Sequence, residues 1–353
     1  MRDGLLCDAR WAGAHGIGRF ASEVLRRLPE HRQLAGGPKP LSAADPLWLA
    51  CQVAARRPRL YFSPGFNPPL LGSTPFVFTI HDLIHIQVPA EATLAKHLYY
   101  RLIVKPACRR AHRVLTVSEY SRAQVLAWSG LPPERVVNVG NGVGPPFQPE
   151  GPRRQTGSPY VLYVGNSKPH KGLLNLLLAF RGIPCPDLRL VLAGRIGAET
   201  ELCVNSLGIG RRTEIIRSPT DEDLACFYRG ALCLVVPSLV EGFGLPALEG
   251  MACGAPVIAS RAAALPEVVG EAGALVDPLD VAAIQREIES VLESPVRQAA
   301  MRANGIERAR QFTWDKVAAR VRAILEQAGE SYQSVARATW LARKLRIVRC
   351  RDG

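Results

Sequence analysis

The sequence has no run of about 18 apolar residues, and this absence excludes a helix that spans a membrane. It also has no long apolar stretch before its first acids, Asp3 and Asp8, so we expect no signal peptide. Its nine cysteines are an odd number and include no Cys-x-x-Cys pair. In a chain of 353 residues this pattern predicts reduced thiols scattered through the core, rather than a disulfide framework or a zinc site.

Acidic residues are scarce relative to basic ones, with 31 Asp and Glu against 44 Lys and Arg and a net charge of +13. Residues 1–150 hold 18 basic and 10 acidic residues, residues 151–330 hold 20 of each, and residues 331–353 hold six and one. Such a surplus is typical of proteins that bind nucleic acid, an anionic membrane or an acidic substrate. Composition leaves all three open, so the motifs must separate them.

The length and the 47% hydrophobic content suit two domains and exclude bulk disorder. Short apolar runs alternate with helix-like stretches, which predicts βαβ units and two doubly wound parallel sheets in an α/β protein. The runs cover residues 5–7, 60–62, 76–80, 114–117 and 136–139, and then 160–164, 188–193, 213–216, 232–236, 256–259 and 274–276.

A stretch rich in proline and glycine, residues 141–159, separates the two sets of strands and is the expected linker. We therefore place an N-terminal domain at 1–148, a C-terminal domain at 149–330 and a basic helical tail at 331–353. Thr313 is the expected N-cap of the last helix before the tail, about residues 313–328. This helix can pack back on the N-terminal domain.

Ligands of open α/β sheets bind beyond the carboxyl ends of the strands. The predicted strand ends present His81-Asp82, Ser118, Gly165 to Lys168, Gly194-Arg195 and Pro237-Ser238.

Gly16 and Gly18 lie between the first predicted strand and the first helix. Glycines in such a loop let backbone N–H groups approach a phosphate at the start of a helix. A dinucleotide fingerprint needs a third glycine, and Ala21 occupies that position. A tight strand-to-helix turn is therefore the alternative interpretation.

Two of the seven lysines, Lys168 and Lys171, fall in the loop 165–172. Lys171 lies at the start of a predicted helix, residues 173–180, where a cation opposes the helix dipole unless an anion binds there. The loop therefore favours a phosphate site, with a solvated loop as the alternative.

Glu241 precedes a predicted helix, and Glu249 lies on that helix eight positions later. Gly242 and Gly244 would expose backbone N–H groups, and Pro246 suits the first helical position. Because N–H groups grip phosphate and carboxylates accept hydrogen bonds from hydroxyls, this segment predicts a ligand that is part anion and part polyol. The alternative is a plain helix start.

The only Asp-x-Asp pattern, Asp221 to Asp223, follows Thr220. An N-cap with acids in the first helical turn explains it better than a metal site, so no metal is expected.

The segment EGFGLPALEGMACGAPVIAS, which begins at Glu241, resembles the signature of the family-4 retaining glycosyltransferases of the GT-B fold. The resemblance extends to about residue 328, and is closest to the bacterial subgroup that adds mannose or related sugars to surface polysaccharides. It includes GIGRF at 16–20, HDL at 81–83, TVSEYS at 116–121, NGV at 141–143, GNSKPHKG at 165–172 and LPEVVGEAGALVDPLD at 265–280.

This resemblance implies two Rossmann-like domains whose parallel sheets face a central cleft, with the nucleotide-sugar donor in the second domain and the acceptor in the first. It implies that Glu249 binds the ribose hydroxyls, Glu241 binds hydroxyls of the transferred sugar, and Lys171 neutralises the diphosphate. His81 would face the donor sugar, completing a catalytic set with Lys171 and Glu241. The implied donor-binding residues also include Gly16, Gly18, Asn166, Lys168, Arg195, Phe243, Gly244 and Leu245.

Asn166 departs from the family, which often has an arginine five residues before its lysine. Lys168 or Arg195 is the expected replacement for that cation. Breaking the anomeric bond leaves negative charge on the diphosphate, which preorganised cations and N–H groups stabilise. The resemblance implies retention by same-face return of the acceptor, with the leaving phosphate taking its proton. His81 would then be a sugar contact rather than a base, or merely the end of a strand.

The predicted function is transfer of a hexose, with mannose from GDP-mannose as the leading choice, to a saccharide acceptor in lipopolysaccharide or exopolysaccharide synthesis. The acceptor is expected to be linked to polyprenyl diphosphate, and no cofactor is expected. A sugar-nucleotide epimerase or another GT-B enzyme is the alternative, although no pyridoxal lysine for a phosphorylase can be placed. A dehydrogenase would have no use for Glu241 and Glu249, and a nucleic-acid binder would need a basic module that the balanced second half lacks.

Residues 96–113 contain six basic and no acidic residues. Arg101, Lys105 and Arg109 are spaced to share one helix face, with Tyr99, Leu102 and Ile103 on another, and Pro106 predicts a kink or break. This segment predicts contact with an anionic membrane, although a solvated helix face is the alternative. The tail adds Arg337, Arg343, Lys344, Arg346 and Arg349 around Trp340, Leu341, Leu345 and Ile347. We expect a cytoplasmic protein bound peripherally to the inner face of the plasma membrane.

Overall fold

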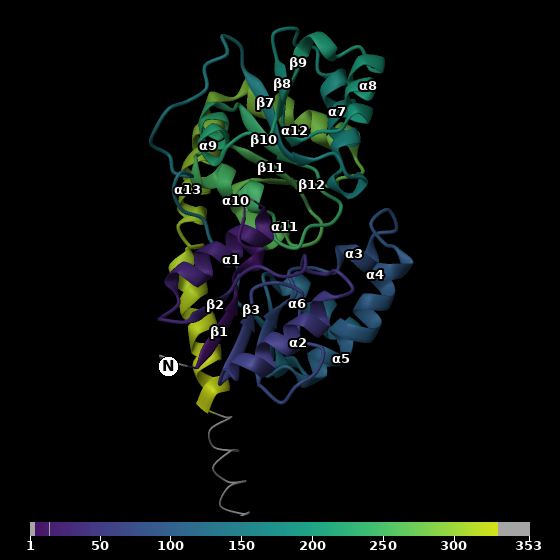
Figure 1. The fold of residues 1–353 in the computed structure, drawn as a ribbon. Helices are drawn as coiled ribbons and strands as arrows, with labels where there is room; N and C mark the ends of the chain where they lie inside the picture. Colours follow the sequence, from purple (N-terminus) through teal and green to yellow (C-terminus); the bar gives the residue numbers. More distant parts are fainter. Residues whose placement is uncertain (1–3, 14, 331–353) are drawn as a thin grey trace, which may run out of the picture.

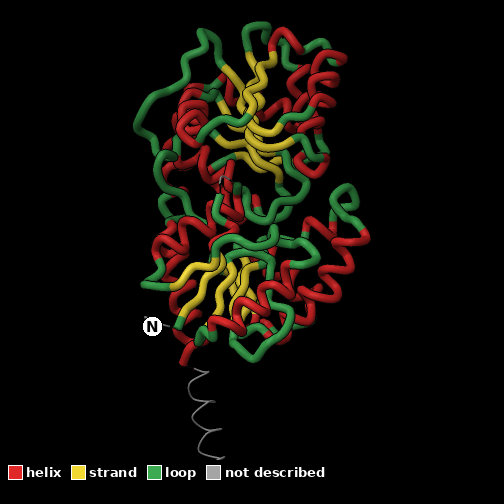
Figure 2. Tube along the Cα trace, in the orientation of Figure 1, coloured by secondary structure: helices red, strands yellow, loops and turns green. Residues whose placement is uncertain are grey.

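Each half of the chain folds around a six-stranded parallel sheet, in a computed structural model that describes residues 4–13 and 15–330. The two sheets belong to two α/β domains stacked one on the other, and helices flank the strands of each domain (Figures 1 and 2). The predicted fold class is confirmed. The predicted basic tail, residues 331–353, lies outside the described residues.

The N-terminal sheet has the strand order β2-β1-β3-β4-β5-β6. Its strands are β1 (Leu5–Asp8), β2 (Arg32–Leu34), β3 (Leu60–Ser63), β4 (Phe76–Thr79), β5 (Arg113–Thr116) and β6 (Val136–Asn138). Its helices are α1 (Gly16–Arg27), α2 (Asp45–Arg56), α3 (Ile84–Gln87), α4 (Leu94–Tyr99), α5 (Lys105–Arg110) and α6 (Glu119–Ser129). The apolar runs did not predict β2, because this short edge strand has two exposed polar residues, Arg32 and Gln33.

The C-terminal sheet has the order β12-β11-β10-β7-β8-β9, which is the strand order of a dinucleotide-binding fold. Its strands are β7 (Tyr160–Asn166), β8 (Arg189–Arg195), β9 (Thr213–Arg217), β10 (Cys233–Val236), β11 (Val257–Ser260) and β12 (Ala274–Val276). Its helices are α7 (Leu173–Gly182), α8 (Ala198–Ser206), α9 (Asp221–Gly230), α10 (Leu245–Ala252), α11 (Leu265–Val269), α12 (Val281–Glu293) and α13 (Pro295–Ala309).

The central strands are apolar throughout because both faces of each sheet are covered. In β7, Tyr160 and Leu162 belong to one core cluster, while Val161 and Tyr163 belong to a second on the opposite face. A strand buried on both faces has no polar side to alternate with, which explains the continuous apolar runs in the sequence. All eight cysteines of the described residues are free, and four of them are buried.

The last described helix, residues 314–330, runs along the N-terminal domain (yellow in Figure 1). Thr313 Oγ1 accepts a hydrogen bond from Lys316 N at 3.3 Å, as an N-cap does. Asp315 pairs with Arg27 on α1 at 2.6 Å, and Arg320 donates to the Val139 carbonyl at 3.3 Å. The chain therefore crosses back to the first domain after completing the second. Within the part that the structure describes, no helix is both long and apolar enough to cross a bilayer.

The basic segment stays helical through Pro106, so of the predicted kink or break, the break is wrong. A π-helical turn, Tyr100–Val104, joins α4 to α5, and Pro106 lies in the first turn of α5. A proline has no N–H to give to the preceding turn, and the wider π turn absorbs that missing bond without ending the helix.

Candidate active site

The C-terminal ends of β7 and β10 form the switch point of the second sheet, where the strand order reverses and open α/β folds bind their ligands. The loop after β7 carries Lys171, and the loop after β10 carries Glu241. Lys171 Nζ donates to Glu241 Oε1 at 2.7 Å, and Ser238 Oγ donates to the same oxygen at 2.9 Å. Both carboxylate and ammonium are largely enclosed, with side-chain exposures of 10% and 19%.

A glycine brings the two loops together. Gly172 has φ +67°, and a β-carbon on it would lie 2.0 Å from the Pro237 carbonyl oxygen. Lys171 ends a 3-10 turn, Pro169–Lys171, so Gly172 separates it from α7. The lysine is thus held beside the helix start rather than in its first turn.

The loop after Glu241 turns into α10 at Gly244, and Pro246 lies in the first turn of that helix. Glu249, on α10, is 4% exposed. Tyr228 Oη donates to its Oε2 at 3.0 Å, and Arg19 of the N-terminal domain pairs with its Oε1. Burial raises the pKa of Glu249, whereas Arg19 and Tyr228 act in the opposite direction. The two predicted carboxylates therefore lie on either side of a buried glycine turn.

Arg19 is a site residue that the sequence reasoning missed, although it belongs to the quoted GIGRF motif. Besides Glu249, its guanidinium pairs with Asp221 at 2.6 Å and lies over the Phe147 ring at 4.9 Å. Arg19 thus joins α1 to two helices of the other domain. Its place directly after Gly18 was the only signal available in the sequence.

His81, at the end of β4, is 5% exposed, and its Nε2 lies 2.9 Å from the Pro64 carbonyl oxygen. Burial lowers the pKa of His81 to about 4, so the ring is neutral at ordinary pH. Because a carbonyl can only accept, Nε2 must carry the proton, which leaves Nδ1 as an acceptor. A neutral ring of this tautomer suits a sugar hydroxyl as its partner.

Asp82, next to His81, was named as a strand end but not as a site residue. Its carboxyl accepts from Ile84 N at 3.1 Å and interacts electrostatically with Glu241 and Lys171 across the domain boundary. Burial raises the pKa of Asp82, and the Glu241 carboxylate adds to that rise. The N-terminal domain therefore contributes an acid to the group around Lys171.

Gly16 and Gly18 form the first turn of α1. The Gly18 N–H donates to Nδ1 of His15, the N-cap, at 3.0 Å, so this donor already has a partner within the protein. Gly16 faces the other domain, since a β-carbon on it would lie 3.4 Å from Leu245 Cδ1. The structure therefore brings the first glycine to the start of α10, directly after the EGFG loop (residues 241–244), and uses the second in a tight turn.

Lys168 and Arg195 differ in what they contact. Lys168 Nζ donates to Glu91 of the N-terminal domain at 2.6 Å, forming an exposed interdomain ion pair. Arg195 lies directly opposite Asn166 in the β7–β8 register, and its positive charge acts on His15 across the domain boundary. No ion pair to Arg195 forms among residues 4–13 and 15–330.

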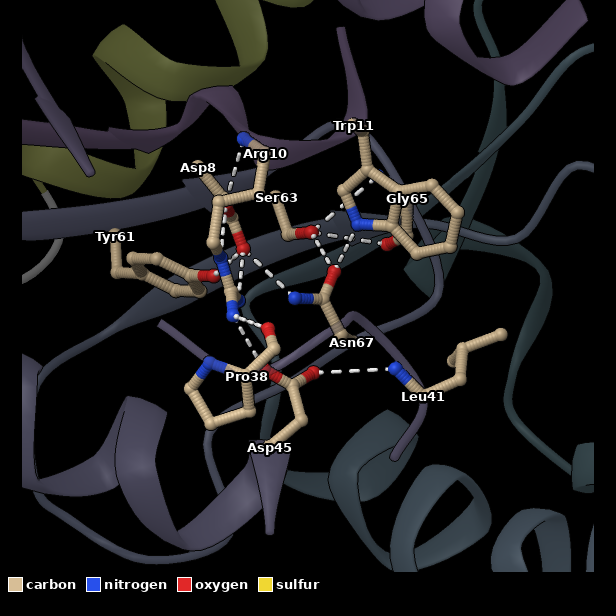
Figure 3. A network of polar contacts seen from close by, with 10 residues as sticks. All are labelled: Asp8, Arg10, Trp11, Pro38, Leu41, Asp45, Tyr61, Ser63, Gly65 and Asn67. Atoms are coloured by element: carbon tan, nitrogen blue, oxygen red, sulfur yellow. Dashed lines mark hydrogen bonds and ion pairs between the residues drawn. The ribbon is translucent and has the colours of Figure 1, made fainter. Parts of the chain in front are cut away.

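The corresponding crevice of the N-terminal sheet, between β1 and β3, is filled by its own side chains (Figure 3). Asp8 accepts from Asn67 Nδ2 at 2.7 Å and from Arg10 at 2.6 Å, and Arg10 reaches Asp45 at 2.6 Å. Asp8, Asp45 and Asn67 are fully buried. The charged groups at this switch point already bind one another, so they are not available to a nucleotide. We therefore look for the nucleotide site at the second sheet.

The acids Asp221 to Asp223 begin α9 in the predicted way. Thr220 Oγ1 accepts from Asp223 N at 3.1 Å, and the Asp223 carboxylate accepts from Thr220 N at 3.0 Å, completing a capping box. No cluster of three metal-ligating side chains occurs in the portion that the structure describes.

The two α/β domains with parallel sheets, with an ion pair and buried carboxylates at the switch point of the second, form the GT-B architecture. The chain belongs to the family-4 glycosyltransferases. The family model "Glycosyltransferase Family 4" matches residues 9–145, and "Glycosyl transferases group 1" matches residues 146–312.

Several curated relatives are mannosyltransferases. O-antigen chain mannosyltransferase B of Escherichia coli is 32% identical over 254 residues, which are 68% of this chain and 67% of the relative. The MMP alpha-(1->4)-mannosyltransferase of Mycolicibacterium hassiacum is 35% identical over 272 residues, which are 72% and 66%. The serotype-specific mannosyltransferase WbdA of Escherichia coli is 29% identical over 59% of this chain, a match that spans only 28% of WbdA.

Solved structures share the fold at lower identity. Sucrose-phosphate synthase from Thermosynechococcus elongatus has a TM-score of 0.71 at 23% identity, covering 95% of this chain and all of that one (100%). Anabaena HepE, in complex with UDP and glucose, has a TM-score of 0.73 at 18% identity, covering 92% and 99%. At these identities the likeness establishes the fold alone.

Proposed function

We propose that this glycosyltransferase moves mannose from GDP-mannose, with retention, to a saccharide acceptor of a cell-surface polysaccharide. The mannosyltransferase relatives support the choice of sugar, and the O-antigen relative supports the polysaccharide. The observation that carries the proposal is the Lys171–Glu241 ion pair at the switch point of the second sheet. A lysine and a carboxylate held at 2.7 Å provide one partner for a diphosphate and one for sugar hydroxyls.

The donor lies across the EGFG turn in this proposal. Glu249 takes the ribose hydroxyls, Glu241 takes hydroxyls of the sugar, and Lys171 takes the diphosphate. HepE, which shares this fold, was solved in complex with UDP and glucose, and this supports a nucleotide-sugar donor. Burial of both carboxylates, at 8% and 4% exposure, strengthens the hydrogen bonds that they accept.

Arg195 is our choice for the cation that Asn166 does not supply. Their opposite positions in the β7–β8 register place the Arg195 side chain one strand from the site of the family arginine. Lys168 is a weaker choice because Glu91 already neutralises it. Lys171 and Arg195 together would carry the charge that a divalent metal carries in other transferases, so we propose a metal-independent reaction.

In the reaction, the bond between the anomeric carbon and the β-phosphate oxygen breaks, and its electron pair stays on the phosphate. The acceptor oxygen bonds to the anomeric carbon on the same face, and its proton passes to the departing phosphate. Each preorganised contact to the developing charge contributes roughly 3 kcal/mol, or about a hundredfold in rate. His81, as a neutral acceptor through Nδ1, orients a sugar hydroxyl and takes no proton.

The N-terminal domain carries a surface that suits a lipid-linked acceptor. Leu94, Leu98 and Leu102 are 77%, 46% and 61% exposed along α4 and the π turn. An open groove of about 580 Å³ beside them is lined by Ile86, Leu94, His97, Leu98, Tyr100, Arg101, Lys105, Pro106, Arg109 and Trp128. We propose that this face lies on an anionic bilayer, the inner leaflet of the plasma membrane, and meets a polyprenyl-diphosphate acceptor there.

A panel of nucleotide sugars tests the function. Thermal stabilisation identifies the donor, because a bound ligand stabilises the folded protein by mass action, and mannose transfer to oligosaccharides identifies the activity. We expect the largest stabilisation with GDP-mannose and unchanged turnover in EDTA. Conversion of the donor to another nucleotide sugar without an acceptor would instead identify an epimerase.

A further inference from the structure

The segment TVSEYS, residues 116–121, meets the EGFG loop across the domain boundary. Ser118 Oγ donates to the Gly242 carbonyl oxygen at 2.7 Å. Ser121 Oγ lies 3.0 Å from the same oxygen and 2.8 Å from the His81 carbonyl oxygen. Both serines are 1% exposed, so two buried hydroxyls of one domain converge on a single carbonyl of the other.

The approach is close enough to require glycine at 242. A β-carbon on Gly242 would lie 2.9 Å from the His81 carbonyl oxygen and 2.9 Å from Asp82 Cβ. The C-terminal domain also holds the N-terminus of α6, since the Glu267 carboxylate accepts from Glu119 N at 2.8 Å and from Tyr120 N at 2.6 Å. The position of Ser118 relative to the EGFG loop is therefore fixed by both domains.

Holding the Gly242 carbonyl fixes the N–H of Phe243. The peptide between them is planar and trans, so its carbonyl oxygen and its N–H point in opposite directions. With the oxygen turned to the serines, the Phe243 N–H faces away from the N-terminal domain. Phe243 is 7% exposed, and its N–H donates to no protein group among the described residues. A backbone donor of a buried residue that has no protein partner is available to a ligand acceptor.

We propose that Ser118 and Ser121 are positioning residues that aim the Phe243 N–H at the sugar oxygens of the donor when the domains close. In an open molecule the serines leave the carbonyl, and the peptide is free to rotate. Closure of the domains then completes the donor site. Transfer therefore occurs only when the acceptor-binding domain is in place. This inference rests on the proposed function, since it takes the EGFG loop as the donor site.

Five variants separate positioning from folding. Ser118→Ala and Ser121→Ala remove the hydroxyls singly and together. Ser118→Thr keeps both the hydroxyl and the helix cap, because Ser118 Oγ also accepts from Ser121 N at 2.9 Å. Ser129→Ala, a buried serine at the far end of α6, is the matched control, since its hydroxyl serves only the local turn at Leu131.

The assay measures GDP release from GDP-mannose with an acceptor that the wild type uses, and GDP affinity by calorimetry. We expect kcat to fall about tenfold or more in the double alanine variant, with the GDP Kd within about twofold of wild type. Ser118→Thr and Ser129→Ala should keep wild-type kcat.

Turnover within about twofold of wild type in the double variant overturns the inference and leaves the proposed function standing. An equal loss in Ser129→Ala also overturns it, because a general weakening of α6 would then explain the result. Absence of GDP binding and of turnover in the wild type would instead overturn the proposed function, and the inference with it.

Discussion

Lys171 and Glu241, which lie on loops after different strands, form an ion pair of 2.7 Å across the switch point of the C-terminal sheet. The pair neutralises two charges that would otherwise be costly to enclose. In the proposed donor site, it would also hold each side chain in place before a donor binds. The same contact would then serve both stability in the free protein and geometry in the complex.

Substituting either partner of this pair should reduce transfer strongly. We expect Lys171→Ala and Glu241→Ala each to lower kcat by about a hundredfold, the effect of losing one preorganised contact. Lys171→Ala should also lower the free energy of unfolding by roughly 2 kcal/mol, because it leaves an enclosed carboxylate without its cation. Mannose transfer and urea unfolding measure the two effects.

The exposed pair Arg310–Glu307 at the C-terminal end of α13 is the control for this prediction, with side chains 72% and 69% exposed. Arg310→Ala should change neither quantity, because exposed pairs contribute little. Near-normal transfer in both Lys171→Ala and Glu241→Ala would show that this pair is not the donor site.

Arg195 and Lys168 should differ as diphosphate ligands. Arg195→Ala is expected to weaken GDP binding about tenfold, since it removes a cation that has no competing ion pair in the described structure. Lys168→Ala should weaken binding less than about threefold, because Glu91 already neutralises that lysine. Calorimetry with GDP compares them, and a larger loss in Lys168→Ala would reverse the assignment.

Arg19 should hold the domains closed. Arg19→Ala removes its ion pairs with Glu249 and Asp221, so we expect roughly 2 kcal/mol lower stability and a larger radius of gyration by small-angle scattering. Arg26→Ala on the same helix is the control, since Arg26 is 67% exposed and pairs only within α1. An unchanged radius with unchanged stability would argue against an interdomain clamp.

Much of the fold follows from the sequence because fully buried strands leave a distinctive pattern. Continuous apolar runs such as residues 160–164 predicted the sheet strands, and the capping signals at Thr220 and Thr313 predicted two helix starts. The edge strand β2 was not predicted, because exposed positions such as Gln33 do not form a continuous apolar run. The π turn before Pro106 was not predicted because a proline indicates the loss of one helical hydrogen bond but not how the backbone compensates for it.

The site was harder to predict wherever two domains meet. Lys171, Glu241 and Glu249 stand in ordered motifs, so their residue types and spacing are enough to indicate a ligand. The contacts of Arg19 with Glu249, and of Lys168 with Glu91, join residues far apart in the sequence. No local spacing encodes such pairs, because they exist only once one domain is placed against the other.

His81 should make stability depend on pH. Its pKa is lowered by burial from the ordinary 6.5 to about 4, so below pH 6.5 the unfolded chain binds the proton more strongly than the folded one. The folded state therefore keeps its full stability above pH 6.5 and loses part of it as the pH falls toward 4. Between pH 7 and pH 5, the neutral His81 ring lowers the free energy of unfolding by about 2 kcal/mol. Urea unfolding at both values should show a smaller pH effect in His81→Asn than in wild type, whereas His97→Asn, at an exposed position on α4, should match wild type.

The groove beside α4 should bind anionic vesicles through charge and exposed leucine together. Arg101, Lys105 and Arg109 line it, and none forms an ion pair with another described residue. Since each basic residue near an anionic surface contributes about 1 kcal/mol, replacing all three by glutamine should weaken binding by roughly a hundredfold at low salt. Leu98→Asp with Leu102→Asp should weaken binding at high salt too, because the lost contact is apolar.

A matched control removes the same charge elsewhere. Glutamine at Arg26, Arg286 and Arg310, which are 67%, 66% and 72% exposed, lowers the net charge equally without touching the groove. Vesicle co-sedimentation compares the two triple variants. If net charge alone governed binding, both would lose affinity to the same extent, and the assignment of the groove would fail. A loss confined to the groove variant would show that position, rather than the overall charge of +13, determines where the protein meets the membrane.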